Sequence, residues 1–220
     1  MISILLAVHN GEEYLREAID SVLNQSFNEF ELLIGLNDST DGSREIIQEY
    51  NDYRITVFDY KEKGKAKTLN KLLKEANFEW IGLQDDDDIW DDCKLEVQMC
   101  NTEGEDVIGT KIFYINEFGD ITGNPKLKLH YSQIVEYSFK GINQIANTSA
   151  IFKRKDAIEV DGWTEGLDGI EDFDFWLKLM IKGCLFTNLD YNGVYHRIHT
   201  KSNFNTKEHD IKGLLETYGL

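Results

Sequence analysis

Strand-like and helix-like segments alternate along the first half of the chain, and this order limits the possible folds more than any other feature. Mostly apolar runs, which are typical of buried strands, lie at residues 2–8, 30–36, 55–58 and 80–83. Segments with apolar side chains at helical spacing separate them, at residues 12–24, at 45–50 and from 65 onward. Because the connections span only a few residues, this alternation predicts an α/β fold with a parallel sheet and helices on both faces.

Polar residues follow three of the predicted strands at the point where each strand ends. The three loops read His9-Asn10-Gly11, Asn37-Asp38-Ser39 and Asp85-Asp86-Asp87-Asp88. In parallel sheets, ligands bind beyond the carboxyl ends of the strands. We therefore expect these loops to meet at one edge of the sheet and to form a binding site.

The second half of the chain is less regular, but it contains no repeat, low-complexity tract or linker. Strand-like runs lie at residues 107–114 and 149–152, with a polar turn at 116–120 after the first of them. Residues 171–182 have helical spacing, and Gly183 is suited to end that helix. This half is therefore expected to complete the same domain.

Composition narrows the range of partners. A hydrophobic fraction of 41% is enough to build a core in a chain of 220 residues, which argues against disorder. The 23 Lys and Arg residues against 40 Asp and Glu residues give a net charge of −17. Because so acidic a surface repels polyanions, we expect no nucleic acid partner.

Cysteine usage and the N-terminal run bear on location. Cys93, Cys100 and Cys184 are odd in number and form no Cys-x-x-Cys pair, so a zinc knuckle and a disulfide framework are not indicated. We expect reduced cysteines and a cytoplasmic protein. The apolar run 2–8 is too short to cross a membrane and lacks the basic start of a signal peptide. We predict no transmembrane segment, while peripheral membrane contact and the oligomeric state stay open.

Four adjacent carboxylates, at residues 85–88, follow the fourth predicted strand. Such groups repel one another unless a cation takes up their charge. In an extended segment residues i and i+2 point the same way, so Asp85 and Asp87 are expected to address one metal ion. Oxygen ligands suit Mg²⁺ or Mn²⁺. A run of charged residues is usually solvated surface, but the place of this run directly after a buried strand favours a metal site. An EF-hand is excluded because its alternating ligands, central glycine and final glutamate are missing.

Five segments, in order, resemble one family. They are Ile2-Ser3-Ile4-Leu5-Leu6-Ala7-Val8-His9-Asn10, the loop from Gly35 to Ser43, Lys65-Ala66-Lys67-Thr68-Leu69-Asn70, the Asp-x-Asp-Asp run within residues 80–90, and Glu171-Asp172-Phe173-Asp174-Phe175-Trp176-Leu177. Together they resemble the family 2 glycosyltransferases of the GT-A fold, over about residues 1–205. Each motif is weak alone, and the five in register are specific.

The resemblance implies a Rossmann-like, mostly parallel sheet flanked by helices, with a smaller mixed C-terminal acceptor part. It implies one catalytic domain over residues 1–205, with a nucleotide-binding half at 1–100 and an acceptor and catalytic half at 101–205. Residues 206–220 are expected to form a tail or a short helix. The implied reaction moves a hexose from a UDP-sugar to a hydroxyl of a glycan, lipid-linked or protein-linked acceptor, with inversion and with Mn²⁺ or Mg²⁺ as cofactor.

Residue roles follow from the same resemblance. The donor-binding residues that it implies are Ala7, His9, Asn10, Asn37, Asp38, Lys65, Asp85 and Asp86. The metal ligands that it implies are Asp87, Asp85 and His199, and Asp88 is a lesser candidate. Asp172 matches the catalytic base, and Glu171 would orient the acceptor or Asp172.

Two positions depart from the family pattern, and a third residue allows two interpretations. Leu36 stands where the loop after the second strand usually has its first acid, so either Asn37 or Asp38 could contact the base. His9 replaces a frequent tyrosine, and either ring can stack on uracil. Trp163 is suited either to an acceptor edge or to the core.

Three other interpretations compete with a glycosyltransferase. A phosphatase with an aspartate nucleophile would have Thr or Val where this chain has Ile89. A sugar-nucleotide pyrophosphorylase would have a Gly-rich, Arg-bearing loop after its first strand. A non-catalytic acidic module that binds divalent metal would leave Lys65, Asn37 and the Glu171-Asp172 pair without a role.

Overall fold

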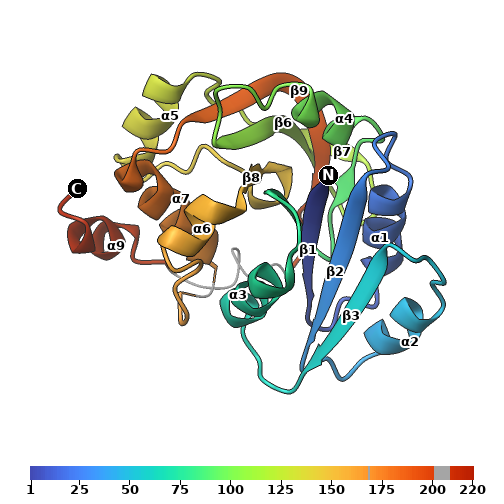
Figure 1. The fold of residues 1–220 in the computed structure, drawn as a ribbon. Coiled ribbons are helices and arrows are strands. Elements are labelled where there is room, and N and C mark those ends of the chain that lie inside the picture. The colour runs from blue at the N-terminus through green and yellow to red at the C-terminus, as the bar shows by residue number, and fades with distance from the viewer. Residues whose placement is uncertain (168, 201–208) are drawn as a thin grey trace.

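The computed structural model describes residues 1–167, 169–200 and 209–220 (Figure 1). Its strands form one sheet in the order β3-β2-β1-β4-β8-β6-β9-β5, and β7 pairs with β6 at the side. The strands are β1 Ile2–Val8, β2 Phe30–Asn37, β3 Ile55–Tyr60, β4 Trp80–Gln84, β5 Ile89–Trp90, β6 Val107–Ile115, β7 Ile121–Gly123, β8 Ile151–Lys153 and β9 Phe186–Arg197. The helices are α1 Leu15–Leu23, α2 Ser43–Gln48, α3 Lys65–Glu75, α4 Lys94–Met99, α5 Tyr131–Ser138, α6 Arg154–Glu159, α7 Glu171–Lys182 and α9 Ile211–Thr217, with a 3₁₀ turn at Asn147–Ser149.

The first half is the parallel sheet that the alternation predicts. Strand β1 pairs in parallel with both β2 and β4, and β2 pairs in parallel with β3. Side chains of β1 point alternately to the two faces, as the period of a strand requires. Ile4 and Leu6 pack with α1 on one face, while Leu5 packs with α3 on the other. The carboxyl ends of β1, β2 and β4 therefore lie at one edge of the sheet.

A close approach between β2 and α3 places the start of that helix. A Cβ atom at Gly35 would lie 2.5 Å from the Thr68 methyl group, so only glycine leaves room for the helix at this distance. Helix α3 begins at Lys65, and the amide of the preceding Gly64 donates to Asn37 Oδ1 at the end of β2, at 2.8 Å. Its first residue is thus brought to the edge where the polar loops meet.

The second half makes the sheet mixed. Strand β8 runs antiparallel to both β4 and β6, and β9 runs parallel to β6. The sequence pattern did not indicate β9, because polar residues such as Asn188 and Asp190 break the alternation of its side chains. In the structure, register shifts around Lys111 interrupt the pairing of β9 with β6. The mixed α/β sheet flanked by helices confirms the expected fold class.

The core around α7 answers the question left open for Trp163. This side chain is 1% exposed and stacks on Phe175, with ring centroids 4.4 Å apart. Phe152 meets both rings edge-on. Trp163 is therefore a core residue and does not form an acceptor edge.

The C-terminal helix α9 packs against the first turns of α7. Leu214 joins a buried cluster with Ile170, Phe173 and Leu177, and the Tyr218 hydroxyl donates to Asp174 at 2.5 Å. Residues 201–208, which include the end of the polar segment after Thr200, lie outside the described residues. No helix in the described part of the chain has the length and apolar character to cross a membrane. All three cysteines are free thiols.

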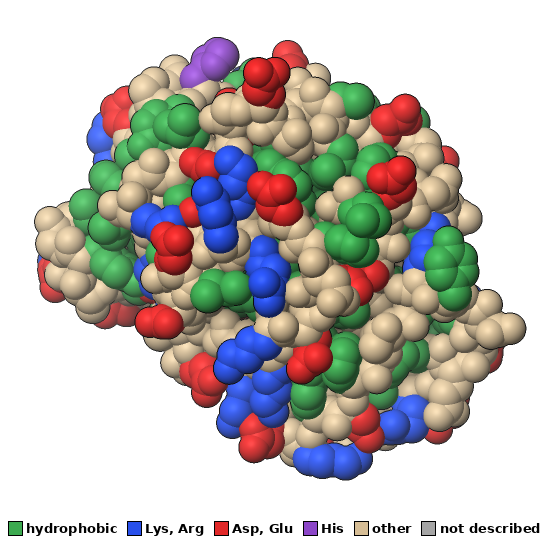
Figure 2. Space-filling model, viewed as in Figure 1, with side chains coloured by type: hydrophobic (Ala, Val, Ile, Leu, Met, Phe, Trp, Pro, Cys, Tyr) green, Lys and Arg blue, Asp and Glu red, His purple; other side chains and the backbone are tan. Residues whose placement is uncertain are grey.

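Basic and acidic side chains are interspersed on the face shown in Figure 2. Ion pairs in the structure join Lys67 to Glu62, Lys153 to Asp106 and Lys182 to Asp156. On this face, charges of opposite sign are thus mixed instead of being gathered by sign.

Lys94, the first residue of α4, carries a fully buried amine. Its Nζ donates to Gln98 Oε1 at 2.9 Å and lies 3.7 Å from the centre of the Trp90 ring. Burial lowers the pKa of Lys94 well below its usual value, because the surroundings disfavour the charged form. The folded chain thus holds this proton less tightly than the unfolded chain.

We predict that Lys94→Met changes the pH dependence of stability. Between the folded and unfolded pKa values of Lys94, the unfolded chain binds the additional proton, so the wild type gains stability as pH rises. The free energy of unfolding of the wild type, relative to the variant, should therefore rise from pH 7 to 10, by at most about 1.4 kcal/mol per pH unit. Urea unfolding of both proteins measures this difference. The exposed Lys74→Met variant is the control, and parallel curves for wild type and Lys94→Met would contradict the prediction.

Candidate active site

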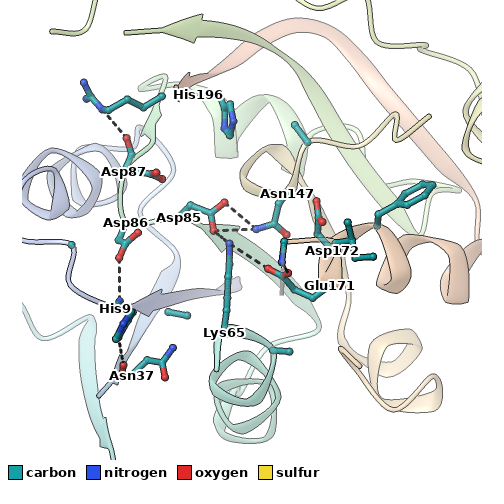
Figure 3. Close-up of a pocket in the computed structure, with 18 of the residues that line it drawn as sticks. His9, Asn37, Lys65, Asp85, Asp86, Asp87, Asn147, Glu171, Asp172 and His196 are labelled. Atoms are coloured by element: carbon teal, nitrogen blue, oxygen red, sulfur yellow. Dashed lines mark hydrogen bonds and ion pairs between the residues drawn. The ribbon is translucent and has the colours of Figure 1, made fainter. Parts of the chain in front are cut away.

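The loops at the edge of the sheet and the start of α7 line one cavity of about 1720 Å³ (Figure 3). Asp87 and Asp172, which are far apart in the sequence, both line it. The predicted site residues that line the cavity are Ala7, His9, Asn10, Asn37, Lys65, Asp85, Asp86, Asp87, Glu171, Asp172 and His199. Asp38 is exposed with a φ of 53° and is not among the cavity-lining residues. The expected meeting of the polar loops is therefore present, with Asn37 and not Asp38 facing the cavity.

Hydrogen bonds tie the loops after β1 and β2 to each other. His9 Nδ1 lies 2.6 Å from the carbonyl oxygen of Asn37, and the His9 amide donates to Asp86 Oδ2 at 3.2 Å. The side-chain oxygen of Asn37 accepts from the Gly64 amide at 2.8 Å, and that of Asn10 accepts from the Thr40 amide at 2.8 Å. The rim is thus a connected surface of ring, amide and carboxylate groups.

Lys65 lies at the centre of the site, between α7 and the acidic loop, which is the turn of residues 85–88 after β4. Its Nζ is 2.6 Å from Asp85 Oδ1 and 3.9 Å from Glu171 Oε1. Burial lowers the pKa of Lys65, but the negative charges of Asp85, Glu171 and Asp172 outweigh that effect and raise it above the usual value. Lys65 is therefore a fixed positive charge in this cavity.

Asn147 is a site residue that sequence reasoning missed. Its Nδ2 donates to both carboxylate oxygens of Asp85, at 3.1 Å each (Figure 3). Together with Lys65 it lowers the pKa of Asp85 despite burial. The only signal was a polar Asn147-Thr148-Ser149 run directly before a buried strand, which alone says nothing about a partner 62 residues away.

The acidic loop turns instead of running extended, and this corrects one expectation. The Asp88 amide donates to the Asp85 carbonyl at 3.4 Å across a turn. Asp85 and Asp87 therefore do not share one direction: Asp85 meets Lys65, whereas Asp87 Oδ2 lies 2.9 Å from His199 Nε2. The rule that residues i and i+2 point the same way holds only for extended backbone, which ends at Gln84.

Asp88 has a structural role. It is fully buried, with Oδ2 2.9 Å from His196 Nδ1, and its Oδ1 accepts from the Arg197 amide at 2.8 Å. Burial lowers the pKa of His196, but the charge of Asp88 outweighs it and raises the pKa to about 9. Asp88 thus holds the end of β9 against the loop and does not line the cavity.

The crowding of carboxyl groups disfavours the charged form of Asp86. Burial, with the charges of Asp87 and Asp85, raises the pKa of Asp86 to about 8. No group of three or more His, Cys, Asp or Glu side chains that could hold a metal by itself occurs in the described residues. Asp87 and His199 nevertheless converge on one point of the cavity, and Mg²⁺ or Mn²⁺ commonly uses one or two protein ligands plus phosphate oxygens and water. The donor set fits a divalent ion shared with a phosphorylated ligand.

Asp172 lies in the first turn of α7, away from the acidic loop in the sequence. Its Oδ2 accepts from Asn143 Nδ2 at 3.3 Å, while Glu171 Oε2 accepts from the Gly169 amide at 2.5 Å. Burial, and then the charge of Glu171, raises the pKa of Asp172 to about 7. A carboxylate with such a pKa can take up a proton near neutral pH.

Comparison with known proteins agrees with this geometry. Residues 3–160 match the family described as Glycosyl transferase family 2. The O-antigen biosynthesis glycosyltransferase WbnJ of Escherichia coli is 29% identical over 211 residues, which cover 92% of this chain and 81% of WbnJ. The UDP-Glc:alpha-D-GlcNAc-diphosphoundecaprenol beta-1,3-glucosyltransferase WfaP of Escherichia coli is 28% identical over 92% of this chain and 79% of its own length.

Solved structures show the same fold at low sequence identity. The structure of S. aureus TarS 1–349 in complex with UDP-GlcNAc superposes with a TM-score of 0.80 at 19% identity, covering 97% of this chain and 64% of that one. This chain therefore spans less than two thirds of the TarS fragment. The mannosyltransferase PcManGT from Pyrobaculum calidifontis, in complex with GDP-Man and Mn²⁺, gives a TM-score of 0.68 at 17% identity, covering 92% of this chain and 58% of its own. With the family match over most of its length, the chain belongs to glycosyl transferase family 2 and is a glycosyltransferase of the GT-A fold.

Proposed function

We propose that this glycosyltransferase moves a hexose from a UDP-sugar to a hydroxyl of a glycan, lipid-linked or protein-linked acceptor, with inversion. The observation that carries the proposal is the shared cavity: a carboxylate with a pKa near 7, Asp172, lies beside the fixed cation Lys65 and opposite the acidic loop. These are the groups needed to bind a diphosphate and to take up a proton from an attacking hydroxyl.

The rim of the cavity is proposed to bind the nucleoside. His9 offers a ring that can stack on a base, and Asn37 lies beside it on the cavity wall. Ala7 and Asn10 line the same end. UDP as the nucleotide is supported by relatives, since TarS is bound to UDP-GlcNAc and WfaP is named for UDP-Glc.

The diphosphate is proposed to lie between Lys65 and the acidic loop. Asp87 and His199 would hold Mn²⁺ or Mg²⁺, which supplies Lewis-acid stabilisation of the charge on the leaving diphosphate. Lys65, at the start of α3, adds an ammonium and the helix amides to the same region. Asp85 is bound to Lys65 and Asn147, and we assign it to orienting Lys65.

Asp172 is proposed as the catalytic base. Its carboxylate would accept the proton of the acceptor hydroxyl as that oxygen attacks the anomeric carbon and the UDP leaves. The hydrogen bond from Asn143 fixes the Asp172 carboxylate, and the Glu171 carboxylate accepts a hydrogen bond from the Gly169 amide. The acceptor is proposed to enter from the side of the cavity that Asn143 and Asn147 line, in a catalytic domain that we place at residues 1–205. A cytoplasmic location stays a prediction from cysteine usage.

We predict that Asp87→Ala removes the gain in UDP affinity that Mn²⁺ provides, because it deletes a direct ligand. The loss should exceed the ~10–100-fold that changes outside the ligand shell cost. Isothermal calorimetry with UDP, in Mn²⁺ and in EDTA, measures it. The exposed Asp92→Ala, five residues further along the chain, is the matched control, and an unchanged response to Mn²⁺ in Asp87→Ala would rule out this ligand.

We predict that Asp172→Asn binds UDP normally but loses catalysis, since the amide cannot accept the proton. Hydrolysis of UDP-glucose or UDP-GlcNAc in the presence of Mn²⁺, in which water takes the place of the acceptor hydroxyl and UDP is released, should fall by about 10²–10⁴-fold. Asp190→Asn, at an exposed carboxylate on β9, is the control. If Asp172→Asn releases UDP at the normal rate, another residue is the base.

We predict that the rate of UDP release in the wild type rises with pH through about 7. Only the deprotonated Asp172 can act as a base, and its pKa is raised to about 7, so the active fraction grows as pH increases. A pH series from 5.5 to 8.5 in constant ionic strength tests this. The rise should be absent from the residual rate of Asp172→Asn, and a flat wild-type profile would refute the assignment.

A further inference from the structure

Arg197, the last residue of β9, is a buried cation that joins three separate segments. Its side chain is 1% exposed. Nε donates to the Asp87 carbonyl at 2.9 Å, and Nη1 donates to the carbonyls of Asn116 and Glu117 at 3.2 Å each. Nη2 donates to Glu17 Oε2 at 2.6 Å. One guanidinium therefore connects the acidic loop, the β6–β7 turn and helix α1.

The same residue is linked to both residues that are assigned to the metal, to Asp87 through its backbone and to His199 through Tyr14. Its Nε and its backbone amide hold the acidic loop from two points, at the Asp87 carbonyl and at Asp88 Oδ1. Its guanidinium lies 4.2 Å from the centre of the Tyr14 ring, and that ring lies 5.4 Å from the ring of His199. Arg197 thus supports the Asp87 backbone by a hydrogen bond and His199 through the Tyr14 ring, which is tilted by 52° against the His199 ring.

Stability alone does not account for this arrangement. Moving a guanidinium out of water is costly, and replacing a buried ion pair by apolar groups is often neutral or stabilising. The carboxylate that Arg197 contacts through Nη2, Glu17, is itself 56% exposed, and the other three acceptors of the guanidinium are neutral carbonyls. What the planar fork of donors does supply is a fixed geometry among segments that are distant in sequence.

We propose that Arg197 is a positioning residue that sets the placement of Asp87 relative to His199, and so the affinity of the site for a divalent cation. The inference rests on the proposed function, in which these two side chains hold the ion. Arg197 acts through its neighbours, since its own side chain is almost completely covered. A lysine keeps the charge but cannot span the same acceptors, because it has one nitrogen in place of three.

The test compares the UDP affinity of wild type and Arg197→Lys by calorimetry, first with Mn²⁺ and then with EDTA. We expect the gain in affinity from Mn²⁺ to fall by about 10–100-fold in the variant, while the affinity in EDTA is unchanged. A merely structural role would lower both affinities together. Arg16→Lys is the matched control, since this arginine is exposed on the same helix as Glu17 and pairs with Glu49.

Tyr14→Leu keeps the inference testable if Arg197→Lys does not fold, because the half-buried Tyr14 ring can be removed without leaving a buried charge unpaired. It cuts the link from Arg197 to His199, so the gain from Mn²⁺ should again fall while the affinity in EDTA is kept. The inference is overturned if Arg197→Lys keeps the full gain in UDP affinity from Mn²⁺, or if Tyr14→Leu keeps it where only that variant folds. An equal loss of UDP affinity in Mn²⁺ and in EDTA also overturns it. If the wild type itself gains nothing from Mn²⁺, the metal part of the proposed function falls, and the inference falls with it.

Discussion

Four carboxylates in a row at the end of a buried strand are the constraint on which the rest of the site depends. Their repulsion would oppose folding if they shared one environment. The turn after β4 instead sends them to different partners: Asp85 to Lys65 and Asn147, Asp86 to the His9 amide, Asp87 to His199, and Asp88 to His196 and the Arg197 amide. These partners come from the ends of β1 and β9, the start of α3 and the turn before β8, so satisfying the four acids brings these segments together.

The first half of the chain could be predicted from the sequence because its signals are local. The apolar run of β1 and the polar residues that follow it lie next to each other in the chain, and parallel pairing brings such loops to one edge. Lys65 and Asp172 also stood in recognisable motifs. The structure brings both to one cavity, although their roles in the reaction remain the subject of the proposal.

The second half of the chain could not be predicted in the same way, because its structure depends on contacts between distant residues. Strand β9 is interrupted by register shifts, and β8 runs against its neighbours. Asn147 and Asn143 become part of the site only when their turns are placed against Asp85 and Asp172. Arg197 has no role in the sequence analysis, because its burial and its four acceptors are visible only in three dimensions.

Lys65 links the two halves electrostatically. Its ammonium lies 2.6 Å from Asp85 on the donor side, and its charge also lowers the pKa of Asp172, against the burial that raises it. A diphosphate paired with this ammonium, as in the proposed function, would offset the charge that now stabilises the Asp172 carboxylate. In that proposal the basicity of Asp172 would depend on what occupies the donor side, and the ion pair of Lys65 with Asp85 would connect donor binding to proton uptake.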